Sequence, residues 1–262
     1  MNRTYALANQ KGGVGKTTTA VNLGAYLSTL GLRVLIVDGD PQSNATSSLG
    51  IDKRQVELST YEILVGQRAA TEAILPTLWE NLSILPASPS LAGAEIEIVD
   101  IPQREYLLRT AIEPVRSDYD YTLIDCPPSL SLLTINALTA AQDGVIVPIQ
   151  CEYLALEGLT ELLNTIALVR ERLSPQTKIR GMLMTMHDPR TNLSQQVVDE
   201  VKAHFGRYVF ETIIPRNVSL GEAPSFGMPI MQYAPRSAGA RAYQNLTLEV
   251  IRADGWQVPE VG

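Results

Sequence analysis

The most chemically informative residues lie near the start of the chain, in the segment KGGVGKTT at positions 11–18. Gly15, Lys16 and Thr17 fit the end of the phosphate-loop pattern G-x-x-x-x-G-K-[ST]. Glycines let main-chain N–H groups approach phosphate oxygens, and a following helix adds the positive end of its dipole. The segment therefore predicts a nucleoside triphosphate site in which Lys16 bridges the β- and γ-phosphates and the Thr17 hydroxyl ligates Mg²⁺.

The same loop departs from the pattern in one respect. Its first glycine would fall at position 10, which is Gln10, and a second lysine, Lys11, follows directly. From the residues alone, Lys11 is either a solvated loop lysine or an additional cation for the phosphates. The residues expected to contact the nucleotide in this loop are Lys11, Gly12, Gly13, Val14, Gly15, Lys16, Thr17 and Thr18.

Three aspartates follow apolar, strand-like runs. Asp38 and Asp40 come after the run 33–37, and Asp125 follows the run 121–124. Side chains alternate along a strand, so Asp38 and Asp40 should share a face, and ligands of open α/β sheets bind beyond the carboxyl ends of strands. We therefore expect these carboxylates to face the metal or the attacking water, with Asp125 holding the Thr17 hydroxyl or a Mg²⁺-bound water. The alternative is that they cap turns.

The elements that would position these residues alternate along the chain. Apolar runs rich in β-branched residues predict strands, helix-like segments lie between them, and this rhythm is typical of a doubly wound, mostly parallel α/β sheet. We expect one domain over residues 1–262, with short helices above the sheet in 50–80. The strands are expected at 5–8, 33–37, 82–85, 121–124, 144–149, 179–184 and 209–214, and the helices at 16–30, 102–116, 131–141, 156–173, 193–205 and 238–252.

The composition limits the class of protein. No apolar run approaches the roughly 18 residues needed to span a bilayer, and the first residues lead into a strand-like run rather than a signal peptide. Cys126 and Cys151 lie in apolar surroundings, so we expect buried thiols, no disulfide and a cytosolic location. The net charge is −7, yet residues 178–241 hold eight Lys and Arg against five Asp and Glu. This basic section keeps a nucleic-acid partner open.

Several further motifs carry a resemblance to a known family. With KGGVGKTT, the blocks VDGDPQSN at 37–44, LIDCPPSL at 123–130, MHDPRTNL at 186–193 and IPRNVSLGEAPSFG at 214–227 resemble the ParA/MinD family of P-loop ATPases with a deviant Walker A box. Together these blocks cover most of the chain. Within the family, the sequence is most similar to the small, Soj-type ParA proteins, which lack an N-terminal helix-turn-helix domain.

This resemblance implies roles for particular residues. Lys11 would cross to the nucleotide of a second subunit in a face-to-face, ATP-dependent homodimer. Asp40 would position or polarise the attacking water, and Asp38 would support the Mg²⁺ shell. Pro215 and Asn217 would contact the adenine. The implied activity is slow ATP hydrolysis with ATP and Mg²⁺, stimulated by a ParB-like partner, in DNA partition.

The resemblance also implies non-specific DNA binding by the ATP dimer on the nucleoid. Arg190, in DPRTN, matches a family DNA-contacting arginine, and Arg216 lies in the same basic section. A second family arginine is replaced here by Ser219, which leaves this step open. The cations considered are Arg190, Lys202, Arg207, Arg216, Arg236 and Arg241.

Other functions remain open at this stage. The chain could position a different cargo, such as a carboxysome or a chemoreceptor cluster, or act as a non-catalytic nucleotide-gated scaffold. It could also regulate position on a membrane surface, as MinD does through a basic amphipathic tail. The tail here, 253–260, contains Pro259 and acidic Asp254 and Glu260, which disfavour an anionic membrane, and Trp256 is expected to pack against the fold.

Overall fold

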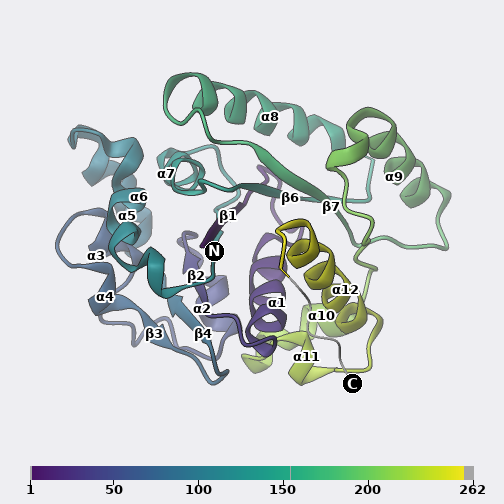
Figure 1. Cartoon of the computed structure of the whole chain (residues 1–262), viewed down its shortest axis with the longest axis horizontal. Helices are drawn as coiled ribbons and strands as arrows, with labels where there is room; N and C mark the ends of the chain where they lie inside the picture. The colour runs from purple at the N-terminus through teal and green to yellow at the C-terminus, as the bar shows by residue number, and fades with distance from the viewer. Residues whose placement is uncertain (1, 154, 257–262) are drawn as a thin grey trace.

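The computed structural model describes residues 2–153 and 155–256, and it places one twisted sheet between two layers of helices (Figure 1). Within these ranges seven strands pair in the order β3-β4-β2-β5-β1-β6-β7, and all neighbours are parallel except β3 and β4. The expected doubly wound α/β sheet is confirmed. The strands are β1 Arg3–Leu7, β2 Val34–Asp38, β3 Leu75–Pro76, β4 Leu82–Leu85, β5 Tyr121–Asp125, β6 Gly144–Gln150 and β7 Ile179–Thr185.

The helices cover both faces of this sheet. The α-helices are α1 Lys16–Thr29, α2 Asn44–Ser48, α3 Thr60–Leu64, α4 Ala70–Ala73, α5 Leu91–Glu97, α6 Leu107–Ile112, α7 Leu132–Ala140, α8 Ala155–Arg172, α9 Asn192–Phe205, α10 Val218–Glu222, α11 Ile230–Tyr233 and α12 Ala238–Ala253. Short 3-10 turns are η1 Ile98–Asp100, η2 Arg104–Tyr106, η3 Glu113–Asp118, η4 Gly206–Tyr208 and η5 Ala223–Phe226.

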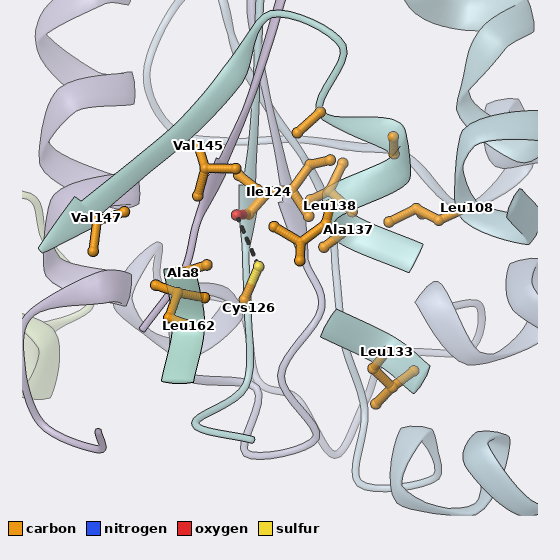
Figure 2. Packing of buried hydrophobic residues seen from close by; sticks show 14 of the residues in the cluster. Ala8, Leu108, Ile124, Cys126, Leu133, Ala137, Leu138, Val145, Val147 and Leu162 are labelled. Carbon is orange, nitrogen blue, oxygen red and sulfur yellow. Dashed lines mark hydrogen bonds between the residues drawn. The ribbon is translucent and has the colours of Figure 1, made fainter. Parts of the chain in front are cut away.

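The alternation of side chains along the strands divides the core into two layers. On β1, Ala6 belongs to the buried cluster that contains residues of α3 to α9, whereas Tyr5 and Leu7 belong to the cluster that contains residues of α1, α2, α11 and α12. Strand β2 is buried at all of its positions, as expected of a parallel strand covered on both faces. Figure 2 shows part of the first layer, where Cys126 lies among Ala8, Ile124 and Leu162.

The two cysteines are free and buried, as expected. Burial raises the pKa of the Cys151 thiol to about 12 and that of Cys126 still further. Both thiols are therefore protonated at neutral pH and act as small apolar side chains.

The structure corrects two expectations about elements. The segment 209–214, expected as a strand, forms one isolated bridge between Val209 and Met182 plus hydrogen bonds from Phe210 and Ile214 to β7. The ring of Phe210 packs against Gly181 of β7, where a Cβ would lie 2.4 Å from the ring, so this packing requires glycine. The expected helix 102–116 is divided into η2, α6 and η3, with Pro114 at the start of η3.

The region 50–80 contains the short helices α3 and α4 together with the antiparallel edge strand β3, which was not expected. Its sequence, Leu75–Pro76, is too short to show an alternating pattern. Proline is tolerated at this edge position because it need not donate to the sheet.

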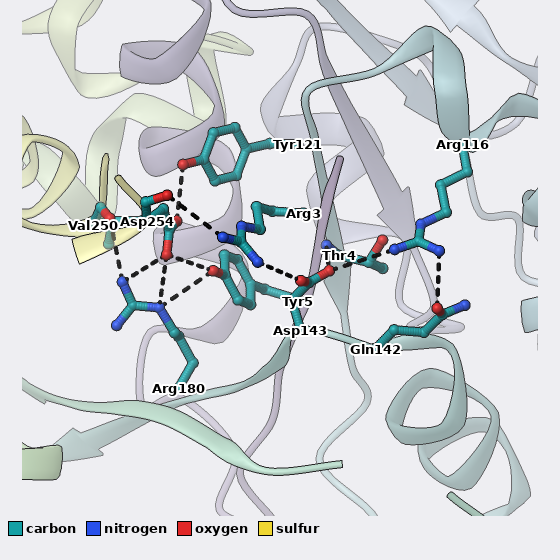
Figure 3. A network of polar contacts seen from close by, with 10 residues as sticks. All are labelled: Arg3, Thr4, Tyr5, Arg116, Tyr121, Gln142, Asp143, Arg180, Val250 and Asp254. Atoms are coloured by element: carbon teal, nitrogen blue, oxygen red, sulfur yellow. Dashed lines mark hydrogen bonds and ion pairs between the residues drawn. The ribbon is translucent and has the colours of Figure 1, made fainter. Parts of the chain in front are cut away.

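A buried polar network fixes helix α12 to the amino-terminal end of the sheet (Figure 3). The carboxylate of Asp254 accepts hydrogen bonds from the hydroxyls of Tyr5 and Tyr121, each at 2.8 Å, and from Arg180 at 2.9 Å. Trp256 packs near the Tyr121 ring, with 6.4 Å between centroids, as expected for this residue. The remaining tail residues, 257–262, lie outside the described residues, so the expectation about Pro259 and Glu260 stays a prediction.

None of the helices in the described ranges combines the length and apolarity needed to cross a bilayer.

Candidate functional site

The phosphate loop joins the end of β1 to the start of α1, as the motif requires. Gly13 and Gly15 have φ values of 74° and 94°, a left-handed conformation that favours glycine. The Thr185 hydroxyl, at the end of β7, donates to the carbonyl of Val14 at 2.9 Å. Asn9 donates to the Pro148 carbonyl of β6 at 2.7 Å. The side chains of Thr185 and Asn9 thus fix the phosphate loop to the ends of β7 and β6. Neither residue is part of the phosphate-loop motif.

Lys16 lies inside the loop. It is 6% exposed, and its ammonium donates to the carbonyl of Lys11 at 3.1 Å. Burial lowers the pKa of Lys16, while the nearby carboxylates of Asp125 and Asp40 act in the opposite direction. A buried cation among loop N–H groups is suited to a phosphate, because the ligand's charge offsets the cost of desolvation.

Thr17 and Asp125 are brought into direct contact. The Thr17 hydroxyl donates to Oδ2 of Asp125 at 2.6 Å. The other oxygen, Oδ1, is buried and has no hydrogen-bond partner among the described residues. Burial, and then the charge of Asp38, raises the pKa of Asp125 well above its usual range. Among the described residues, Oδ1 is therefore free to contact a cation or to accept from a bound water.

Asp38 is aligned with Asp125 at the ends of adjacent strands β2 and β5. Its Oδ2 accepts from the main-chain N–H and hydroxyl of Thr46, at 2.8 and 2.6 Å, and Oδ1 accepts from the N–H of Asp40 at 3.2 Å. Burial raises the pKa of Asp38 to about 6. The expected support of the Mg²⁺ shell would therefore be indirect, through the position of Asp40.

Gly39 separates the two acids and lies against β5. Its N–H donates to the carbonyl of Asp125 at 2.9 Å, and a Cβ at this position would lie 2.8 Å from that same oxygen. A side chain here would displace Asp125, so the close approach requires glycine.

A cavity of about 480 Å³ opens over the loop. Asp40, which is 6% exposed, lines it, while its Oδ1 accepts from the N–H of Gln42 at 2.9 Å. The structure thus brings together most of the expected loop residues and Asp40. The lining residues are Gly12, Gly13, Gly15, Lys16, Thr17, Thr18, Asp40, Gln42, Asn44, Ser47, Ser48, Pro128, Met186, Pro224 and Ser225.

The residues expected at the adenine lie apart from this lining. Pro215 contributes instead to a separate hollow of about 470 Å³, together with Glu211 and Arg241. Asn217 does not line the nucleotide cavity, although Pro224, seven residues later, does. The Oδ1 atom of Asn217 is buried and has no hydrogen-bond partner in the described part of the chain. Met186, which does line the cavity, has a left-handed φ of 53° that no sequence signal indicates. The adenine contacts stay a prediction.

The donor set fits magnesium bound together with phosphates. Among residues 2–153 and 155–256, no group of three or more His, Cys, Asp and Glu side chains is placed to hold a metal. Mg²⁺ differs from structural metals in that it keeps several waters and needs one or two protein oxygens beside substrate phosphates. The Thr17 hydroxyl and the unpartnered oxygen of Asp125 supply such oxygens.

Lys11 lies at the rim of the nucleotide cavity and is not among the residues that line it. Its side chain is 36% exposed, and its ammonium lies 3.6 Å from Oε2 of Glu152. Arg216 donates to Oε1 of the same carboxylate at 3.1 Å. Arg190, the other arginine expected at DNA, pairs with its neighbour Asp188 at 2.9 and 2.7 Å. The sequence reasoning missed both carboxylates. Glu152 lies far in sequence from Lys11 and Arg216, so its ion pairs leave no local pattern. Asp188, in contrast, stands only two residues before Arg190.

Comparisons with known proteins agree with this arrangement. A family model described as an AAA domain matches residues 2–179. The chain is 57% identical to the sporulation initiation inhibitor protein Soj of Bacillus subtilis, over 95% of this chain and 98% of that protein. It is 50% identical to the chromosome partitioning protein ParA of Caulobacter vibrioides, over 95% and 94%.

A solved structure is also similar over the whole chain. It is described as cobyrinic acid a,c-diamide synthase from Mycobacterium smegmatis with bound ATP analogue and magnesium. It shares 39% identity with this chain at a TM-score of 0.85, and the match covers 99% of each chain.

Proposed function

Because the chain belongs to the ParA/MinD family of P-loop ATPases, on its Soj-type ParA branch, we propose that it drives DNA partition as an ATP-dependent homodimer. The chain is an ATPase that uses ATP and Mg²⁺. The proposed cycle has three parts: pairing of two subunits on ATP, non-specific binding of the pair to DNA, and release on hydrolysis. Cytoplasmic and nucleoid-associated locations follow from that cycle.

The separation of the two lysines is the observation that carries the proposal. Lys16 is buried beside Asp125 and Asp40, where it would neutralise the chain's own triphosphate. Lys11 stands at the rim with a partly exposed side chain. A triphosphate with Mg²⁺ retains negative charge, and a cation entering from a second subunit would offset it as an arginine finger does. Nucleotide would then join two copies of the chain.

Hydrolysis would rest on the carboxylates at the ends of β2 and β5. Thr17 and Asp125 would hold magnesium, which would neutralise the charge that develops on the phosphates. Asp40 would position the attacking water from its place on the cavity wall. Its Oδ1 already accepts from the N–H of Gln42, which fixes the carboxylate. The family resemblance implies slow turnover by the chain alone and acceleration by a ParB-like partner.

DNA binding is proposed for the basic section, with Arg190 and Arg216 as contacts. In this structure both guanidinium groups pair with carboxylates, Arg190 with Asp188 and Arg216 with Glu152. The arginine of each pair is more than half exposed, so it can exchange its carboxylate for a phosphate. Two such patches on one rigid dimer would act together, which suits weak contacts and strong salt dependence.

The name of the Mycobacterium smegmatis structure denotes a different activity. The curated partition proteins are more similar to this chain in sequence, at 57% and 50% against 39%, and the proposal rests on them.

One experiment tests the central step. The solution mass is measured by light scattering for the chain without nucleotide, with ADP and with a non-hydrolysable ATP analogue. A doubled mass with the analogue alone supports the proposal, and an unchanged mass in all three conditions contradicts it. A gel shift on random-sequence DNA under the same conditions then tests whether the dimer binds DNA despite Ser219.

A further inference from the structure

One carboxylate at the rim of the cavity faces two cations from different loops. Oε2 of Glu152 lies 3.6 Å from the ammonium of Lys11, and Oε1 accepts from Arg216 at 3.1 Å. Glu152 follows β6, and its N–H donates to the carbonyl of Gln150 at 2.8 Å, which fixes its main chain. Its side chain is 43% exposed and is absent from the lining of the nucleotide cavity.

The main chain of Lys11 is held firmly, whereas in the described part of the chain its ammonium makes one ion pair, with Glu152. The Lys11 N–H donates to Oδ1 of Asn9 at 3.0 Å, and its carbonyl accepts from Lys16 at 3.1 Å. Asn9 is itself anchored to the carbonyl of Pro148. Moving the Lys11 ammonium outward therefore needs changes in side-chain torsions but no movement of the loop.

We propose that Glu152 is a positioning residue that holds Lys11 on its own subunit and thereby raises the ATP concentration at which two subunits pair. The inference rests on the proposed role of Lys11 at the partner's nucleotide. One ammonium cannot lie against Glu152 and against a triphosphate in the other subunit at once. The free energy of the Lys11–Glu152 pair is therefore subtracted from that of dimerisation.

Arg216 strengthens this hold. Because it occupies Oε1, it restrains the rotamer of Glu152 and leaves Oε2 directed at Lys11. Loss of Arg216 should therefore loosen the Lys11–Glu152 pair and act in the same direction as loss of Glu152, with a smaller effect. This can be measured in the absence of DNA, where the proposed DNA contact of Arg216 has no influence.

The test compares Glu152→Gln with the wild-type chain in DNA-free buffer. Light scattering gives the concentration of non-hydrolysable ATP analogue at which half of the chain is dimeric. An exposed ion pair contributes modestly, so we expect this midpoint to fall about two- to fivefold in the variant. The difference should shrink in about 1 M salt, where the Debye length is about 3 Å. Glu171→Gln, which removes the same charge from an exposed position at the end of α8, should match the wild type.

Two further variants separate this role from others. Glu152→Asp keeps the charge and should return the midpoint toward the wild-type value. In a Lys11→Ala background, adding Glu152→Gln should leave the affinity for the analogue unchanged, and a changed affinity would mean that Glu152 acts on the nucleotide directly, which overturns the inference. A midpoint in Glu152→Gln equal to or above that of the wild type also overturns it. If the wild-type chain itself stays monomeric, the proposed function fails instead.

Discussion

The hydroxyl of Thr17 and the carboxylate of Asp125 are joined by a 2.6 Å hydrogen bond, although 108 positions separate them in the chain. The sheet order explains the contact, because β5 lies next to β1 and the register aligns Leu7 with Asp125. The loop that follows β1 therefore returns over the carboxyl end of β5. The contact leaves the second oxygen of Asp125 buried and without a partner among the described residues.

Replacing Asp125 by Asn should weaken binding of ATP in the presence of Mg²⁺ by about 10- to 100-fold, since a charge-assisted contact is lost. In EDTA the variant and the wild type should bind alike. Because burial raises the pKa of Asp125, the variant should also be no less stable than the wild type without nucleotide. Calorimetric titration with and without Mg²⁺ checks the first point, and an equal loss in EDTA would contradict it.

The two lysines of the loop should give different defects. Lys16→Ala should lose ATP affinity by about 10- to 100-fold, because it removes a charged donor to the phosphates. Lys11→Ala should keep ATP affinity and remain monomeric. Equilibrium binding and light scattering on both variants provide the measurement, each serving as the control for the other. A Lys11→Ala chain that dimerises like the wild type would remove the basis for a trans role.

Asp40→Ala should stop turnover while leaving the ATP dimer intact. A positioned side chain that takes a proton from the reacting group typically contributes about 10²–10⁴-fold in rate, so the variant should accumulate a long-lived dimer. Phosphate release and dimer lifetime are measured together, with Asp52→Ala as a control, since that partly buried aspartate pairs with Arg54 away from the cavity. Unchanged phosphate release in Asp40→Ala would mean that another residue positions the attacking water.

The stability difference between Asp38→Asn and the wild type should depend on pH. The folded-state pKa of Asp38 is raised from 3.8 to about 6, so the folded chain binds more protons than the unfolded chain between these values. Wild-type stability from this group is then greatest below about pH 4 and is lost as pH rises to about 6. Without Mg²⁺ and nucleotide, Asp38→Asn should therefore gain relative to wild type by up to about 3 kcal/mol over this interval. Thermal unfolding at pH 4 and pH 7 measures it, and a constant difference would contradict it.

Removing Arg190 should weaken DNA binding at every sequence alike. Each lost phosphate contact lowers the slope of log K against log salt concentration by about 1. Gel shifts of Arg190→Ala with the ATP analogue, in a series of salt concentrations, provide the slope, and Arg54→Ala serves as an exposed arginine control. If both variants keep the wild-type slope, the DNA contact lies elsewhere in the basic section.

Much of the fold was predictable because its determinants are local. Buried parallel strands such as β2 read as continuous apolar runs, and α1 begins directly after a glycine loop. Segment 209–214 shows where such reasoning fails. Its apolar residues are those of a strand, yet Phe210 packs across Gly181, and the pairing is reduced to one bridge and a few hydrogen bonds. The apolar composition of a segment predicts that it is buried, whereas its hydrogen bonding as a strand depends on its position and register against the neighbouring strand.

The candidate site divides in the same way. The sequence determined the phosphate loop, the aspartates at strand ends and the family, since these depend on spacing within short segments. Tertiary structure alone decided that Asp38 turns to Thr46, that Thr185 holds the loop, and that Lys11 and Arg216 share Glu152. The contacts of Thr185, Lys11 and Arg216 join residues far apart in the chain, and the Asp38–Thr46 contact spans eight positions. The energies of all these contacts depend on distance and burial, which are set only when the strands take their order in the sheet.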